Sequence, residues 1–186
     1  MLAATMFLLT NIAGAGQFED GLAAYDRKDY AAALKLFQPL AKQGNVHAQT
    51  NLGAMYANGH GVQQDYAESM KWYALAAKQG NALALFSVGQ LHVFGRGVPR
   101  NEVEGMKWWR QAADRNYGIA QFNLGLSYAK GAGVGKDMIE AHKWINLSGM
   151  RGHERAANTL GILEGTMKPE QIAEAKKRAA AWKALK

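Results

Sequence analysis

The chain has 186 residues, a formal net charge of +7 and no cysteine. Without cysteine it cannot form disulfides, zinc–thiolate sites or iron–sulfur clusters, and it has no thiol nucleophile. The length suits one domain with a sizeable core. The excess positive charge is concentrated in residues 168–186, which is typical of a solvated helix face and not of a basic stripe with aromatics that binds nucleic acid. We therefore expect no nucleic-acid partner.

The N-terminus differs in composition from the rest of the chain. Residues 1–12 form an apolar run, and Ala13-Gly14-Ala15 follows it, as in the apolar region and cleavage site of a secretory signal peptide. The run is too short to cross a bilayer, which takes about 20 residues, and no Lys or Arg precedes it. We predict a signal peptide over residues 1–15 and a periplasmic or secreted mature protein. The alternative is a buried N-terminal helix in a cytoplasmic protein.

The remaining chain repeats itself with a period of 36 residues. Residues 45–80, 81–116 and 117–152 align without a gap. An atypical repeat precedes them at residues 16–44, and a partial repeat with a capping helix follows at residues 153–186. The matching positions include Gly53, Gly89 and Gly125; Gly59, Gly95 and Gly131; Gly61, Gly97 and Gly133; and Trp72, Trp108 and Trp144.

Each copy predicts two helices joined by a glycine turn. The first helix of the first copy spans residues 46–58, with its apolar residues on one helical face. The G-x-G-V segment ends it, because glycine accepts the left-handed conformation that closes a helix. The second helix begins with Asp65, Asn101 or Asp137, and an acid follows three residues later. This spacing predicts a capping box in each copy, with the Trp of the second helix filling the core.

The pattern A-x-x-x-L-G-x-x-Y-x-x-G-x-G-V-x-x-D, completed by K-W-x-x-x-A-A-x-x-G, resembles the Sel-one-like repeat, a relative of the tetratricopeptide repeat. The resemblance covers about residues 18–186. Departures are local: His92 replaces a Tyr, Asn116 a Gly, and Ser148-Gly149 an Ala pair. The resemblance implies an all-α fold, an α-α solenoid forming a right-handed superhelix of about 4.5 helix pairs with a C-terminal capping helix. Members of the family are mainly protein-binding adaptors.

Several short patterns imitate catalytic or cofactor sites. The G-x-G-V segments follow helices and not strands, so they are no dinucleotide fingerprint. Ser127 and Lys130 have the S-x-x-K spacing, but the partner motifs of that chemistry are missing. The five histidines lack metal-ligand spacing. We therefore expect no enzyme, no cofactor and no metal.

The predicted function is a protein-interaction adaptor of the bacterial envelope that binds a protein or an extended peptide in a concave groove. In the tetratricopeptide relatives the first helix of each pair lines that groove. A cell-wall protein that binds or processes peptidoglycan is the alternative function, and an acidic partner for the basic C-terminal helix is a further expectation. The alternative for the groove Phe residues is that they pack against the adjacent repeat. Carried onto this chain, the expected groove residues are Thr50, Asn51, Phe86, Ser87, Gln90, Phe94, Phe122, Asn123, Leu126 and Lys130.

Overall fold

A computed structural model describes residues 16–185, and the predicted signal peptide at residues 1–15 lies outside them. Every element of regular secondary structure among the described residues is a helix, which confirms the predicted all-α fold of helix pairs. None of these helices is both long and apolar enough to cross a membrane. The described residues fall into two compact units, 16–84 and 85–185, and each is described by itself.

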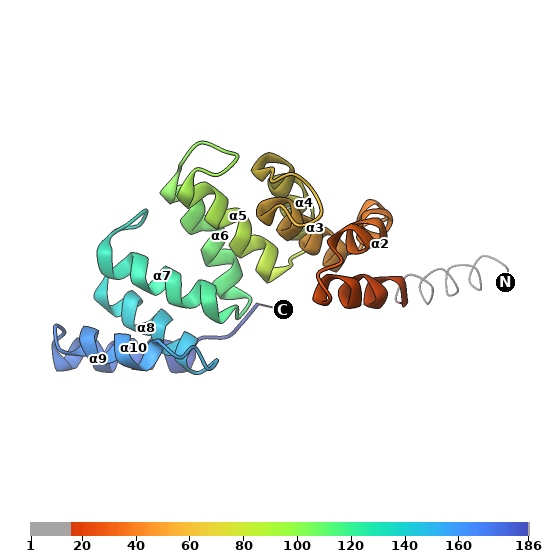
Figure 1. Cartoon of the computed structure of the whole chain (residues 1–186). Coiled ribbons are helices and arrows are strands. Elements are labelled where there is room, and N and C mark those ends of the chain that lie inside the picture. The colour runs from red at the N-terminus through yellow and green to blue at the C-terminus, as the bar shows by residue number, and fades with distance from the viewer. Residues whose placement is uncertain (1–15, 186) are drawn as a thin grey trace, which may run out of the picture. The chain divides into compact units, whose positions relative to one another are not determined.

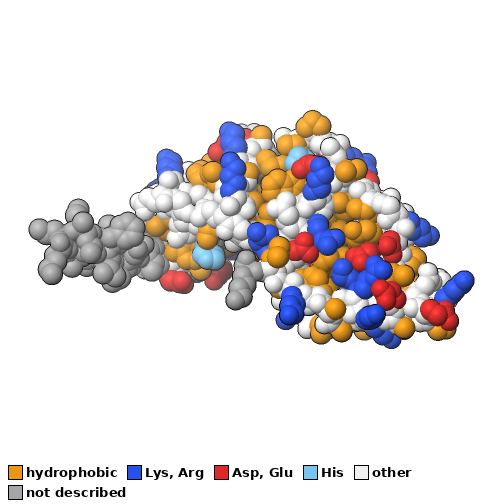
Figure 2. All heavy atoms as spheres, turned by 180° about the vertical axis from the view of Figure 1, so that it is seen from behind, with side chains coloured by type: hydrophobic (Ala, Val, Ile, Leu, Met, Phe, Trp, Pro, Cys, Tyr) orange, Lys and Arg blue, Asp and Glu red, His pale blue; other side chains and the backbone are white. Residues whose placement is uncertain are grey.

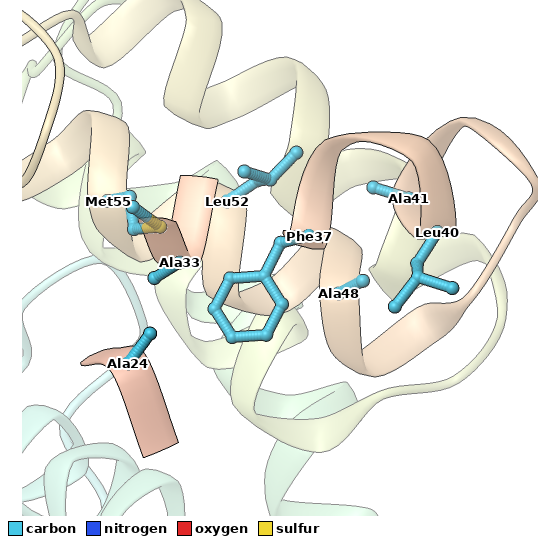
Figure 3. Close-up of a cluster of buried hydrophobic side chains, with 8 residues drawn as sticks. All are labelled: Ala24, Ala33, Phe37, Leu40, Ala41, Ala48, Leu52 and Met55. Atoms are coloured by element: carbon cyan, nitrogen blue, oxygen red, sulfur yellow. The ribbon is translucent and has the colours of Figure 1, made fainter. Parts of the chain in front are cut away.

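The first unit contains helical residues 16–26, α2 (Tyr30–Lys42), α3 (Val46–Asn58) and α4 (Tyr66–Lys78) (Figure 1). The helix predicted over residues 46–58 is confirmed as α3. The core of the unit lies among the first three of these helices, where the Phe37 ring is fully buried. Its buried members, drawn in Figure 3, are Ala24, Ala33, Phe37, Leu40, Ala41, Ala48, Leu52 and Met55.

The second unit contains most of α5 (Ala82–Phe94), followed by α6 (Glu102–Asp114), α7 (Gly118–Lys130), α8 (Met138–Gly149), α9 (Ala156–Glu164) and α10 (Pro169–Ala181). A core cluster joins α7, α8 and α9 through Phe122, Ile145 and Leu163. The terminal helix α10 packs against α8, and its own residues Ala175 and Ala179 are buried. This is the inward face expected of a capping helix.

The turn inside each full copy has the same construction. Both glycines of the segment take positive φ angles, 70° at Gly59 and 73° at Gly61 in the first copy. The side chain of the next cap residue then accepts hydrogen bonds from the amides that begin the second helix, as at Asp65. The caps at Asn101 and Asp137 do the same.

The reciprocal half of the predicted capping box is absent from these caps. The cap residue's own N–H donates to a carbonyl of the preceding helix, at 2.9 Å from Asp65 to Tyr56 in the first copy. The acid three residues later is therefore not needed to accept this N–H, and Glu68 pairs with Lys71 instead. The second and third copies repeat both bonds, from Asn101 to His92 and from Asp137 to Tyr128, with the pairs Glu104–Lys107 and Glu140–Lys143.

Consecutive helix pairs within a unit are joined through a buried glutamine. The Gln49 side chain donates to the Ala41 carbonyl at 3.1 Å in the first unit. Gln121 makes the same bond to the Ala113 carbonyl, also at 3.1 Å, in the second. Each bond satisfies a carbonyl in the last turn of one helix with a side chain from the helix that follows.

The two helices of each full copy touch at a glycine. A Cβ atom at Gly125 would lie 2.5 Å from Ile145 Cγ1 and 2.9 Å from the Ala141 carbonyl oxygen. A Cβ atom at Gly53 would come similarly close to the Tyr73 ring, and one at Gly89 to the Trp109 ring. The residue that fills this contact is therefore the one after the recurring Trp. The expected core packing of the Trp is confirmed for Trp144, which is fully buried. Trp72 is partly buried against the core cluster of the first unit, and Trp108 is only partly buried.

We expect alanine to have opposite effects at two copies of this glycine position. Gly125→Ala should destabilise the fold by about 1–3 kcal/mol, because the added methyl group meets backbone as well as a side chain. Gly161→Ala should stabilise it by up to about 1 kcal/mol, since no atom lies within 4 Å of the added Cβ and alanine is the better helix former. Urea unfolding followed by circular dichroism measures both. Equal effects of the two substitutions would contradict the close contact.

Candidate functional site

Two of the expected groove residues, Thr50 and Asn51, lie on α3 in the first unit. The Thr50 hydroxyl donates to the Val46 carbonyl at 2.8 Å and its side chain is buried. The Asn51 amide donates to the His47 carbonyl at 2.9 Å. Both side chains are thus bonded to their own helix.

Phe86 and Phe122 are buried in the second unit. Phe86 is 6% exposed and stacks on the Trp109 ring, with 5.6 Å between centroids. Phe122 is 2% exposed and stacks on His153 at 4.1 Å. Of the two interpretations open for these side chains, the structure supports packing. The neighbouring Ser87 is buried as well.

Five expected residues remain accessible on the second unit. Phe94 is 57% exposed at the end of α5, where the Arg96 guanidinium lies 5.6 Å from its ring centroid. Gln90 is half-buried one turn earlier, and Asn123 and Leu126 are half-buried on α7. Lys130, at the end of α7, is also exposed.

A pocket of about 190 Å³ brings three of these residues together, and we call it the groove pocket. Leu126 contributes apolar surface, because its side chain rests on the core cluster. Asn123 and Lys130 add an amide and a cation from the same helix. The full lining is Val93, Glu102, Met106, Trp109, Asn123, Leu126, Ser127, Lys130 and Ala132.

A second, larger pocket of about 490 Å³ lies where α7 begins and where the chain turns from α8 to α9. We call it the turn pocket. Sequence reasoning missed it, because His153, Glu154 and Arg155 are not repeated at the corresponding positions of the earlier copies. Its lining is Tyr117, Gly118, Ile119, Arg151, Gly152, His153, Glu154 and Arg155.

His60, His142 and Ser127 have structural contacts in the fold. His60 stacks on Tyr30 at 4.2 Å, and the Tyr25 hydroxyl lies 2.8 Å from its Nδ1. His142 is fully buried with its Nε2 2.8 Å from a Glu164 oxygen. The Ser127 hydroxyl donates to the Asn123 carbonyl at 3.0 Å. Within residues 16–185 no group of three or more potential ligands is placed to hold a metal ion.

The basic C-terminal helix is partly neutralised by the chain itself. Arg178 pairs with Glu140 at 3.1 Å and with Glu174 at 2.8 Å, and Lys176 pairs with Glu164 at 3.1 Å. Figure 2 shows basic and acidic side chains intermingled over the C-terminal helices. The positive charge of α10 therefore serves largely to fasten it to α8 and α9.

Glu140 is the centre of this ionic network. Burial would raise the pKa of its carboxyl, but hydrogen bonds from Lys143, Arg178 and the Trp144 indole outweigh it and hold that pKa below the ordinary value of 4.5. Ionised Glu140 therefore stabilises the folded state above pH 4.5, and this contribution is lost as the pH falls through the lowered pKa.

The comparisons with known proteins agree with the repeat pattern. The family model described as the Sel1 repeat matches residues 15–45, 46–81, 82–117 and 118–153. No curated protein matches the sequence.

Two solved structures are similar to the chain over most of its length. One is a Sel1 repeat protein from Oxalobacter formigenes, with 30% identity and a TM-score of 0.77, covering 88% of this chain and 69% of that one. The other is a protective antigen present in uropathogenic Escherichia coli strains, which displays an SLR fold. It has 28% identity and a TM-score of 0.77, and the match covers 90% of this chain and 38% of that one.

Replacing Glu140 should make the free energy of unfolding less dependent on pH in the acid range. Glu140→Gln should lower the free energy of unfolding at pH 7 by about 1–3 kcal/mol, since it removes hydrogen bonds to charged groups. The difference from the wild type should shrink between pH 5 and pH 3, where the wild type also loses the ionised group. Urea unfolding across this range measures it, with Glu19→Gln as the control, because exposed Glu19 has no ion pair among the described residues. A difference that stays constant with pH would contradict the network.

The burial of Phe122 predicts a loss of stability when it is replaced. Phe122→Ser should cost about 3–5 kcal/mol, because it removes a core ring and buries a hydroxyl. Phe94→Ser should change stability little, since that ring is 57% exposed. Thermal unfolding compares the two. An unchanged melting temperature for Phe122→Ser would contradict the buried position of Phe122 and favour its assignment to the groove.

Proposed function

Because the chain belongs to the Sel1 repeat family, whose repeats are protein-interaction scaffolds, we propose that it is a non-catalytic adaptor that binds an extended segment of a partner protein along helix α7. The observation that carries the proposal is the groove pocket. It combines an apolar floor at Leu126 with an amide and a cation at Asn123 and Lys130. Such a mixture favours an apolar anchor side chain with polar contacts to the partner's backbone around it.

The binding segment is revised by the burial of Phe86 and Phe122. With both rings in the core, the accessible part of the expected groove lies on the second unit and consists of Gln90, Phe94, Asn123, Leu126 and Lys130. Phe94 offers a second apolar contact at the end of α5. Aromatic side chains of this kind are enriched among residues that dominate binding energy.

The proposed location is the bacterial envelope. It is supported by the apolar run and the A-x-A site of residues 1–15. Peptidoglycan binding stays the alternative function, and an acidic cell-wall peptide would then occupy the same groove.

Peptides selected from a displayed library of random dodecapeptides test the adaptor function. We expect the full chain to recover binders whose affinity, measured by fluorescence anisotropy, falls at least about tenfold for Leu126→Glu, because a charge then replaces the apolar floor. Asn123→Arg, which fills the same pocket from its half-buried rim, should weaken binding similarly.

Ile162→Glu is the matched control, since Ile162 is an exposed apolar residue of α9 that lies outside the groove pocket. It should leave the affinity unchanged, and thermal unfolding should show that all three variants are folded. Failure to recover binders, or binders that ignore both groove substitutions, would refute the proposal.

A further inference from the structure

We propose that the turn pocket receives an acidic side chain of the same partner segment whose apolar residue occupies the groove pocket. One extended peptide would then contact both ends of α7. This inference rests on the proposed function and specifies the chemistry of the ligand.

Two arginines supply positive charge to the turn pocket. Among the described residues neither Arg151 nor Arg155 of the lining forms an ion pair. Other arginines of the chain, such as Arg110 and Arg178, do pair with carboxylates. Arg151 Nε donates to the Asn116 side chain at 2.8 Å. The Arg155 guanidinium lies 5.1 Å from the Phe122 ring centroid. These contacts hold both guanidinium groups in place before a ligand arrives, which lowers the entropy cost of binding a carboxylate.

The start of α7 in this pocket lacks the cap found in the earlier repeats. Asn45 and Asn81 each accept a hydrogen bond at 2.9 Å from the amide of the third helical residue. Tyr117 stands at the corresponding position and makes no side-chain cap bond. The first amides of α7 are therefore left for another acceptor, and the positive end of the helix dipole favours an anion.

His153 lines the pocket with a ring that is fixed by stacking on Phe122. The cavity thus combines two guanidinium groups with helix amides that have no side-chain cap. Glu154 is the one carboxylate in the lining, and it opposes the positive charge.

One stripe of α7 connects the two pockets. Ile119, Asn123, Leu126 and Lys130 are spaced by four, three and four residues, which places them on one helical face. Ile119 lines the turn pocket, and the other three line the groove pocket. Helical rise gives about 10 Å between Ile119 and Leu126, a distance that about three residues of extended peptide span. The ligand signature is thus an apolar residue and an Asp or Glu about three positions apart.

The experiment uses dodecapeptides selected on the full chain whose binding depends on Leu126. We expect these peptides to carry the apolar–acid signature. A peptide Glu→Gln change and Arg155→Gln in the chain should each weaken binding about tenfold, because each removes a hydrogen bond between charged groups. The two changes together should weaken it no more than either alone, which shows that they break the same contact.

Two further variants keep the test independent of any effect of Arg155→Gln on folding. Glu154→Gln should strengthen binding several-fold, since it removes the only opposing charge of the lining. Lys177→Gln is the matched control: Lys177 is an exposed cation of α10 outside both pockets, and its loss should leave the affinity unchanged.

The outcomes separate this inference from the proposed function. Peptides that need Leu126 but show no acid preference, and no response to Arg155→Gln or Glu154→Gln, would overturn the inference and leave the adaptor function standing. Peptides indifferent to Leu126 would overturn both. Displacement of a bound acidic peptide by low-millimolar inorganic phosphate would identify a free-phosphate site and also overturn the inference.

Discussion

The close approach of two helices at a glycine is the constraint on which each full repeat depends. Gly53, Gly89 and Gly125 recur on the first helix, and a small residue, Ser69, Gly105 or Ala141, recurs opposite them. In the first copy the contact is close enough for the Ser69 hydroxyl to donate to the Gly53 carbonyl at 2.7 Å. Because backbone lies almost against backbone, the pair has little freedom to slide or rotate. The orientation of the exposed face of each first helix follows from this contact.

The glycine turns and their caps carry that orientation from one helix to the next. A left-handed glycine ends the first helix, and the N–H of the following cap residue bonds back to a carbonyl of the helix just ended. On the second unit this places α7 with Phe122 turned into the core and with Asn123, Leu126 and Lys130 turned outward. The proposed binding face is therefore a consequence of how the pair is built.

Much of this fold could be predicted from the sequence, because the period of 36 repeats its local signals three times. The helix at residues 46–58, the left-handed glycines and the three caps all arise from short-range chemistry. The filling of the glycine contact by Tyr73, Trp109 and Ile145 could not be predicted, since it depends on how one helix is rotated against another. The recurring Trp lies one residue before this contact, and of its three copies Trp144 is fully buried while Trp72 and Trp108 are partly buried.

The candidate site was less predictable for the same reason. Sequence spacing placed Phe86, Phe122, Asn123 and Leu126 near one helical face, but a few tens of degrees of rotation decide which of them is buried. The turn pocket gave no periodic signal, because His153, Glu154 and Arg155 are not repeated at the corresponding positions of the earlier copies. Its character depends on Tyr117 standing where two earlier copies have a capping Asn.

The central claim is that the outward stripe of α7 is the ligand-binding face. Chemical-shift mapping tests it most directly, with the isotope-labelled full chain titrated by one selected peptide. The account predicts that the shifted resonances concentrate in residues 117–130 and 151–155. Shifts confined to α8 and α10, with residues 117–130 unmoved, would contradict it.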